Sequence, residues 1–105
     1  MGAYIQLSTT TATEEDALRI SREVVGKRLA ACVQVMGPIR SIYWWKDKME
    51  ETEEWLCIMK TREALYEKLE TRIREIHPYE EPEIVALPIV AGSRGSLGWI
   101  DREVG

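Results

Sequence analysis

The chain has 105 residues, of which 45% are hydrophobic and 30% charged, and its net charge at pH 7 is −4. This length suits a single domain over residues 1–105 with a core of its own. Nucleic-acid-binding proteins usually carry a basic face, so the acidic balance argues against a DNA or RNA partner. No apolar run approaches the roughly 20 residues that a membrane-spanning helix needs, and no secretory signal is recognisable. We therefore expect a cytoplasmic protein without a membrane partner.

The first two expected elements are a strand and a helix. Residues 3–9 alternate between polar and apolar side chains, which is typical of a short strand. Residues 11–31 carry apolar side chains at spacings of three and four, which predicts an amphipathic helix. Thr13 and Asp16 are spaced as residues that cap a helical first turn.

The chain then changes to a strand pattern, and residues 31–61 predict one long hairpin. Its first strand is interrupted at Gly37–Pro38, because a proline donates no hydrogen bond to a neighbouring strand. A turn centred on Asp47–Lys48 would place Cys57 opposite that proline. Cys32 would then lie about 20 Å from Cys57. A disulfide needs Cα atoms within about 7 Å of each other, so we expect two reduced, buried cysteines.

Three further elements complete the chain. Residues 62–77 return to helical spacing, and Pro78 ends that helix. Residues 82–89 are almost all apolar, which predicts a strand that is covered on both faces or paired centrally. Residues 96–104 predict a short last helix.

These elements predict an α+β fold in the order βαββαβ with an extra C-terminal helix, which is the ferredoxin-like arrangement. The helices of such a fold cover one face of an antiparallel sheet and leave the other face open. The hairpin is also too long and too aromatic to stay in water, and another copy of the chain is the simplest cover. The aromatic residues expected at that interface are Tyr43, Trp44, Trp45 and Trp55.

His77 is the only histidine, and two interpretations of it stay open. In the first, His77 ends the second helix and interacts with the negative end of the helix dipole. In the second it is a metal ligand. A structural zinc site uses four nitrogen or sulfur ligands, so the remaining ligands would have to come from neighbouring chains.

Two groups of glutamates suggest a cation site or acid–base chemistry, but solvated side chains are the more ordinary interpretation. The glutamates in the second strand of the hairpin would protect an edge strand. The sequence has no Walker loop and no Gly-x-Ser-x-Gly motif, so we do not expect an enzyme. The glutamates concerned are Glu80, Glu81 and Glu83 after His77, and Glu50, Glu51, Glu53 and Glu54 in the hairpin.

Several stretches together resemble the CutA family, the divalent-cation tolerance proteins. They are LAACV (29–33), SIYWWKDKMEETEEWLCIMKT (41–61), HPYEEPEIVALPI (77–89) and LGWI (97–100). The resemblance implies a homotrimer in which the hairpins extend the sheets between subunits, and a link to tolerance of copper and other divalent metals. It also implies that clefts between subunits are lined by Lys60, His77, Tyr79, Glu83 and Trp99.

Two positions differ from the copper-binding members of that family. Ser8 stands where they have a cysteine, and Ile76 stands where they have a second histidine. Thiolate and imidazole ligands favour copper, so we expect His77 to bind copper or another divalent metal only weakly. Tyr79 and Glu83 would orient the imidazole.

The hypothesis from the sequence is a homotrimeric, non-enzymatic protein that requires no cofactor and binds a small ligand in its clefts. Lys60 would favour an anionic group on that ligand. Two alternatives stay open. One is a PII-like sensing module that binds an anionic metabolite and a partner protein, and the other is an enzyme with His77 as general base.

Overall fold

The computed structural model describes residues 3–105, so the first two residues of the expected domain lie outside the described part. The described residues form a four-stranded antiparallel sheet with helices, which confirms the predicted α+β class. The elements follow one another in the predicted order. They are β1 (Tyr4–Thr11), α1 (Glu14–Gly26), β2 (Cys32–Trp45), β3 (Lys48–Arg62), the 3-10 helix η1 (Glu63–Leu65), α2 (Tyr66–Ile76), β4 (Val85–Pro88) and α3 (Arg94–Glu103).

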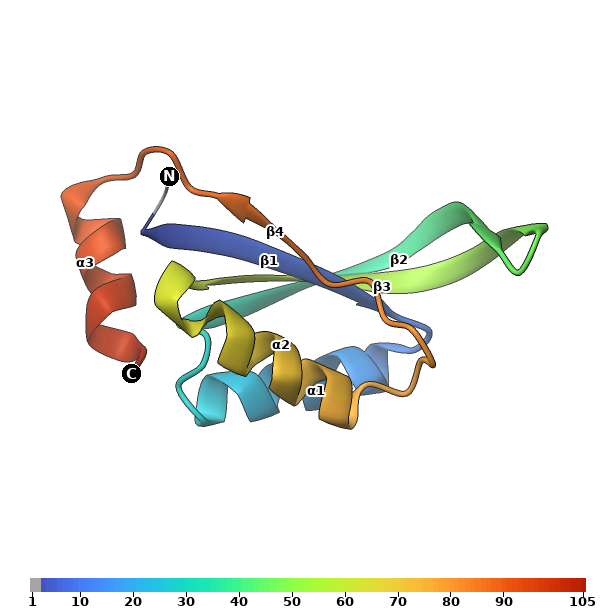
Figure 1. The fold of residues 1–105 in the computed structure, drawn as a ribbon, viewed down its shortest axis with the longest axis horizontal. Helices are drawn as coiled ribbons and strands as arrows, with labels where there is room; N and C mark the ends of the chain where they lie inside the picture. Colours follow the sequence, from blue (N-terminus) through green and yellow to red (C-terminus); the bar gives the residue numbers. More distant parts are fainter. Residues whose placement is uncertain (1–2) are drawn as a thin grey trace.

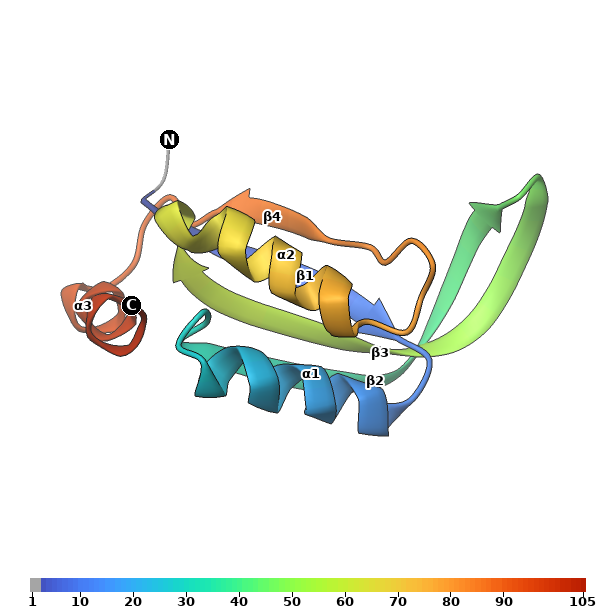
Figure 2. The ribbon, with the colours of Figure 1, turned by 60° about the horizontal axis from the view of Figure 1, so that its bottom comes forward.

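The sheet has the strand order β2-β3-β1-β4, and every neighbouring pair is antiparallel. Helices α1 and α2 cover one face, whereas α3 stands at the end of the sheet that is remote from the hairpin tip (Figure 1). In Figure 2 the distal part of the β2–β3 hairpin bends away from the rest of the sheet. The core between the sheet and the two helices contains Leu7, Ala17, Ile20, Val24, Ala30, Cys57, Met59, Leu69 and Ile73.

Helix α1 has the predicted cap but is shorter than the predicted helix at both ends, and Thr11 belongs to β1. The Thr13 side chain caps α1 by accepting a hydrogen bond of 3.1 Å from the backbone N–H of Asp16. The helix was expected to run to residue 31, but it ends at Gly26. Arg28 has a φ of 58°, and this left-handed conformation turns the chain back toward the sheet.

The β2–β3 hairpin is confirmed, with a turn one residue earlier than predicted. Lys46 and Asp47 both have positive φ, 51° and 65°, as the two central residues of a tight hairpin turn require. A bulge follows Met36. Turn and bulge together place Cys57 opposite Val35 rather than Pro38.

The two cysteines are free, as predicted. Cys32 lies three residues along β2 from the partner of Cys57, which is about 10 Å at 3.3 Å per residue and too far for a disulfide. Cys57 is buried, but Cys32 is only half-buried, so the prediction that both thiols are buried was wrong for Cys32. The reason is that Cys32 faces the uncovered side of the sheet.

The second half of the chain differs from the prediction at one strand. The predicted helix divides into η1 and α2, and Glu70 and Arg74 of α2 form an ion pair at 3.0 Å. Strand β4 is shorter than predicted and lies at the edge of the sheet rather than at its centre. The Leu87 side chain on it is 62% exposed, so its apolar run is not covered within one chain.

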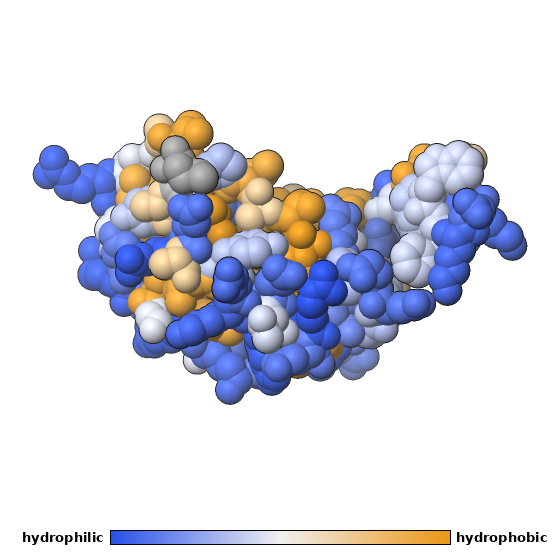
Figure 3. All heavy atoms as spheres, viewed as in Figure 1, coloured by the Kyte–Doolittle hydropathy of each residue, from blue (hydrophilic) through white to orange (hydrophobic). Residues whose placement is uncertain are grey.

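Apolar side chains remain exposed on two surfaces. On the open face of the sheet, away from α1 and α2, they are Met36, Val85 and Leu87, with Val90 just beyond β4. Figure 3 shows hydrophobic atoms gathered over β4 and the segment that follows it. On the distal hairpin they are Trp44 and Met49, which we call the outer hairpin face. None of the helices in residues 3–105 is long and apolar enough to cross a membrane.

Gly37 provides a test of this packing. A Cβ atom at this position would lie 2.6 Å from Trp55 Cγ and 2.7 Å from its Nε1, so Gly37→Ala must displace the indole ring from the core. We expect a loss of about 1–3 kcal/mol of stability, measured by urea unfolding. Gly95→Ala is the control, because a Cβ there meets no atom within 4 Å. Equal stabilities of the two variants would contradict this packing.

Candidate functional site

A cavity of about 780 Å³ lies between the distal hairpin and the loop of residues 77–84, which follows α2. The end of β1 closes one side of it. Ser41, Tyr43 and Trp45 recur at every second position of β2, so their side chains share the face of the hairpin that the cavity uses. Its lining consists of Thr10, Ala12, Ser41, Ile42, Tyr43, Trp45, Thr52, Glu53, Glu54, Pro78, Tyr79, Glu80, Glu81 and Glu83.

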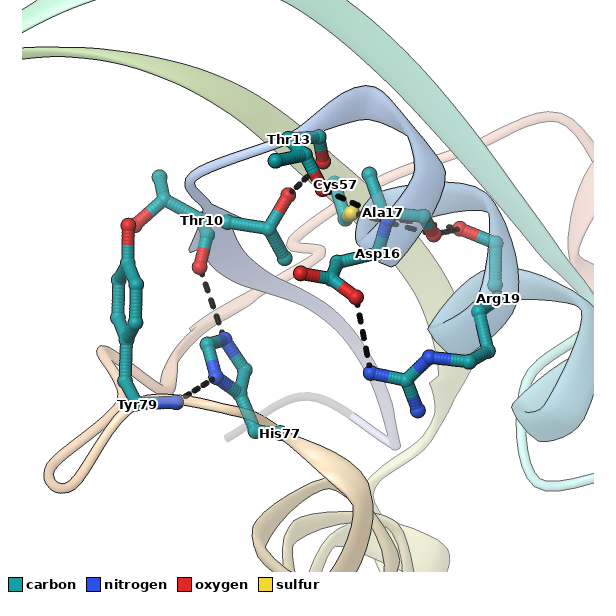
Figure 4. Close-up of polar contacts among 10 residues, drawn as sticks. Thr10, Thr13, Asp16, Ala17, Arg19, Cys57, His77 and Tyr79 are labelled. Carbon is teal, nitrogen blue, oxygen red and sulfur yellow. Dashed lines mark hydrogen bonds and ion pairs between the residues drawn. The ribbon is translucent and has the colours of Figure 1, made fainter.

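His77 fixes the loop that forms this cavity. It is the C-cap residue of α2, and its backbone N–H donates to Ile73 O at 2.8 Å. Its imidazole Nε2 lies 2.8 Å from Thr10 O at the end of β1. The backbone N–H of Tyr79 donates to Nδ1 at 3.1 Å (Figure 4). A ring that accepts at Nδ1 and meets a carbonyl at Nε2 must be neutral and carry its proton on Nε2.

The surroundings keep both His77 and Tyr79 uncharged. His77 is only 8% exposed, and this burial lowers its pKa against the opposing effect of its hydrogen bond to Thr10. The Tyr79 hydroxyl donates to Glu54 Oε2 at 2.6 Å. Burial and this bond to a carboxylate raise the pKa of Tyr79 well above its usual range. A neutral imidazole and a neutral phenol therefore border the cavity at pH 7.

The lining of the cavity is acidic. Five glutamates contribute to it, and none of its lining residues is a lysine or an arginine. Lys46 at the hairpin tip reaches across to Glu80 at 3.4 Å, and its Nζ lies 5.5 Å from the centre of the Trp45 ring. Arg74 reaches Glu81 from outside at 3.2 Å.

One chain brings together only part of the residues that the sequence suggested as a cleft. Tyr79 and Glu83 line the cavity, and His77 lies behind Tyr79. Lys60 instead projects from the open face of the sheet, where its Nζ donates to Gln34 Oε1 at 3.2 Å. Trp99 is on α3, at the end of the molecule remote from the hairpin tip (Figure 1).

The four aromatic residues expected at a subunit interface lie in different surroundings. Tyr43 and Trp45 face the cavity. Trp44 belongs to the outer hairpin face and is 73% exposed. Trp55 packs against the core of the same chain.

Glu54 is a site residue that was not predicted from the sequence. It was expected to be a solvated residue that protects a strand edge, but only 5% of it is exposed. The alternation of β3 places it on the same face as Thr52, toward the cavity. Its burial comes from the loop after α2, because the Tyr79 hydroxyl of that loop donates to Glu54 Oε2. Strand alternation gives Glu54 the same face in the predicted and in the observed register, so no local pattern in β3 reports this contact.

The site contains no preformed metal chelate within one chain. Among residues 3–105, no three histidine, cysteine, aspartate or glutamate side chains are grouped so that they could hold a metal ion. Both nitrogens of His77 already have hydrogen-bond partners.

Comparison with known proteins identifies the family. The model of the CutA1 divalent ion tolerance protein family matches residues 5–103. The chain belongs to this family. The divalent-cation tolerance protein CutA of Thermus thermophilus is 42% identical over 96 residues, which cover 91% of this chain and 93% of that protein. Mouse protein CutA is 45% identical over 101 residues, or 96% of this chain.

Solved structures of the CutA family have the same fold. A structure of the Thermus thermophilus protein superposes with a TM-score of 0.94 at 39% identity, covering 97% of this chain and 99% of that chain. CutA1 of Oryza sativa gives a TM-score of 0.95 at 34% identity, covering 99% and 95%. The chain spans little more than half of the mammalian relatives, 57% of the mouse protein and 55% of the human one.

The buried histidine predicts a pH dependence of stability. Because the folded state lowers the pKa of His77, the unfolded chain binds a proton more readily as the pH falls through about 6.5. Stability is therefore complete above that pH and decreases toward pH 5. We expect the thermal midpoint of metal-free protein, measured with a chelator, to fall over this range.

His77→Gln is the comparison for that measurement, because it removes the only histidine. No other side chain has an unperturbed pKa in that window, so the variant should have a nearly constant midpoint between pH 7.5 and 5. Parallel pH profiles for the two proteins would show that the His77 ring is not held in the neutral form.

Proposed function

We propose that the chain acts as a homotrimeric, non-enzymatic CutA-type protein in divalent-cation tolerance, with ligand sites in clefts beside the His77–Tyr79 loop. In this proposal each subunit has the ferredoxin-like arrangement, and the β2–β3 hairpin reaches onto a neighbouring subunit. The protein needs no resident cofactor. The proposal rests mainly on one observation, the exposure of the outer hairpin face to solvent in a single chain.

The exposed surfaces support assembly from copies of the same chain. Trp44 and Met49 are directly opposite each other in the hairpin and are 73% and 66% exposed. The open face of the sheet presents a second apolar surface around Leu87. Soluble monomers rarely expose such surfaces, and closed symmetric assembly covers two different surfaces of every subunit at once.

The state of His77 supports a non-enzymatic role. A general base needs a free lone pair within reach of a substrate proton. The Nδ1 lone pair of His77 accepts the Tyr79 N–H, and its Nε2 faces Thr10 O. Tyr79 is a poor proton donor because its pKa is raised.

The same geometry supports only weak metal binding at His77. A divalent cation would need a ring nitrogen that now holds either the loop or the end of β1. Further ligands would have to come from a neighbouring subunit. We therefore keep weak binding of copper or another divalent metal as part of the proposal.

The cavity lining gives less support to the alternative of a PII-like sensor of anionic metabolites. Such a sensor needs cations around its ligand, and Lys60 lies on the open face of the sheet, outside the cavity. A cytoplasmic location remains part of our proposal, although one solved relative, from Archaeoglobus fulgidus, is described as a periplasmic CutA protein.

The assembly proposal is tested by changing the outer hairpin face. We expect native mass spectrometry to find a trimer for the wild type. Trp44→Glu should weaken its association by about tenfold or more, because buried tryptophans commonly dominate interfaces. Val25→Glu on the outside of α1 is the matched control, since it adds the same charge at an exposed apolar position. A folded wild-type monomer at micromolar concentration would refute the proposal.

The metal part of the proposal has its own measurement. Calorimetric titration with Cu(II) should give weak heats for the wild type that disappear in His77→Ala. Equal heats for both proteins would remove His77 as a ligand.

A further inference from the structure

Glu54 is a buried carboxylate without a counter-charge. It is 5% exposed, and among the described residues only the Tyr79 hydroxyl donates a hydrogen bond to it, at Oε2. Within residues 3–105, Glu54 belongs to no ion pair and its Oε1 accepts no hydrogen bond. Oε1 is not among the fully buried unpaired atoms, so a ligand in the cavity can reach it.

The cavity beside Glu54 has the features of a site for a cation with an apolar body. Four further glutamates line it, and no lining residue carries a positive charge. Aromatic rings of Tyr43, Trp45 and Tyr79 form part of its wall. Ring faces of this kind attract cations, and they also pack against hydrocarbon.

Lys46 shows that an alkylammonium group fits this environment. Its Nζ lies 5.5 Å from the centre of the Trp45 ring and 3.4 Å from Glu80 Oε1. The ammonium is therefore held between an aromatic ring and a carboxylate, on the rim of the same cavity. Both partners of this ion pair are largely exposed, so the contact is weak and a competing cation can displace it.

We propose that this cavity binds a small organic cation, with a primary ammonium or guanidinium group against Glu54 and a hydrocarbon body against Tyr43 and Trp45. The inference rests on the proposed function, because it names the ligand class of the clefts beside the His77–Tyr79 loop. Such a ligand satisfies the free Oε1 of Glu54 by a charge-assisted hydrogen bond.

The size and chemistry of the site favour an organic cation over a bare metal ion. A volume of about 780 Å³ is within the usual range for small-molecule sites. No three metal-binding side chains of residues 3–105 are grouped as ligands. An anion would meet five carboxylates and no lining cation, so electrostatic repulsion excludes it.

Three probes that share one hydrocarbon body test the proposal. Benzylammonium, benzyl alcohol and phenylacetate carry positive, neutral and negative groups on the same benzyl body. Calorimetric titrations on the 105-residue protein at constant ionic strength should show binding of benzylammonium only. Binding of all three with equal affinity, or of none, would overturn the inference.

Two variants test whether benzylammonium binds at Glu54. Glu54→Gln keeps an oxygen that accepts the Tyr79 hydroxyl but removes the charge, and we expect it to weaken benzylammonium binding by about tenfold or more. Glu63→Gln is the matched control, because it removes the charge of an exposed glutamate that lies outside the cavity. Unchanged affinity in Glu54→Gln would overturn the proposal.

Lys46→Gln is expected to strengthen the binding of benzylammonium. It removes the internal ammonium that occupies the rim, so benzylammonium should bind about two- to fivefold more tightly. Weaker binding in this variant would contradict the competition.

The oligomeric state separates this inference from the proposed function. Native mass spectrometry on the same samples reports assembly independently of ligand binding. If the protein is a trimer that does not bind benzylammonium, only the ligand inference is wrong. If it is a monomer that binds benzylammonium, only the assembly proposal is wrong. If Glu54→Gln dissociates the trimer without altering probe binding, Glu54 serves a subunit contact and the inference is wrong.

Discussion

The β2–β3 hairpin is longer than the body that supports it, and the other features of the molecule follow from this mismatch. Strand β1 pairs with β3 only as far as Trp55, so the distal residues of β2 and β3 pair with each other alone. A two-stranded ribbon has no third layer to cover it and is marginally stable in water. One face of this ribbon meets the loop after α2 and encloses the cavity, while the outer hairpin face remains exposed.

A neutral imidazole links the parts of the molecule that form the cavity. His77 joins the end of α2 to the end of β1 and to the backbone of Tyr79, and Tyr79 in turn reaches β3 through Glu54. Only the neutral ring can donate at one nitrogen and accept at the other. The residue that most resembles a metal ligand in the sequence therefore has a structural task in the folded chain.

The charges of the site also change what the family resemblance suggests. Lys60 at a motif position pointed to an anionic group on the ligand. In the folded chain Lys60 belongs to the open face of the sheet, and the cavity retains the carboxylates. Carboxylates that are spread over a large cavity attract positive charge without forming a tight coordination shell. The cavity can therefore attract cations without a cluster of chelating side chains.

The sequence by itself determined the family, the α+β class, the order of the elements and the free cysteines, because periodicity, caps and motif residues are local properties. It did not determine the exact hairpin register, since two consecutive residues with positive φ, Lys46 and Asp47, moved the turn by one position. The burial of Glu54 depends on its contact with Tyr79 in the loop after α2, which the pattern of β3 does not encode. The edge position of β4 and the separation of Lys60 from His77 were decided by tertiary structure alone. Strand order brings together residues that are remote in sequence, and no local pattern encodes it.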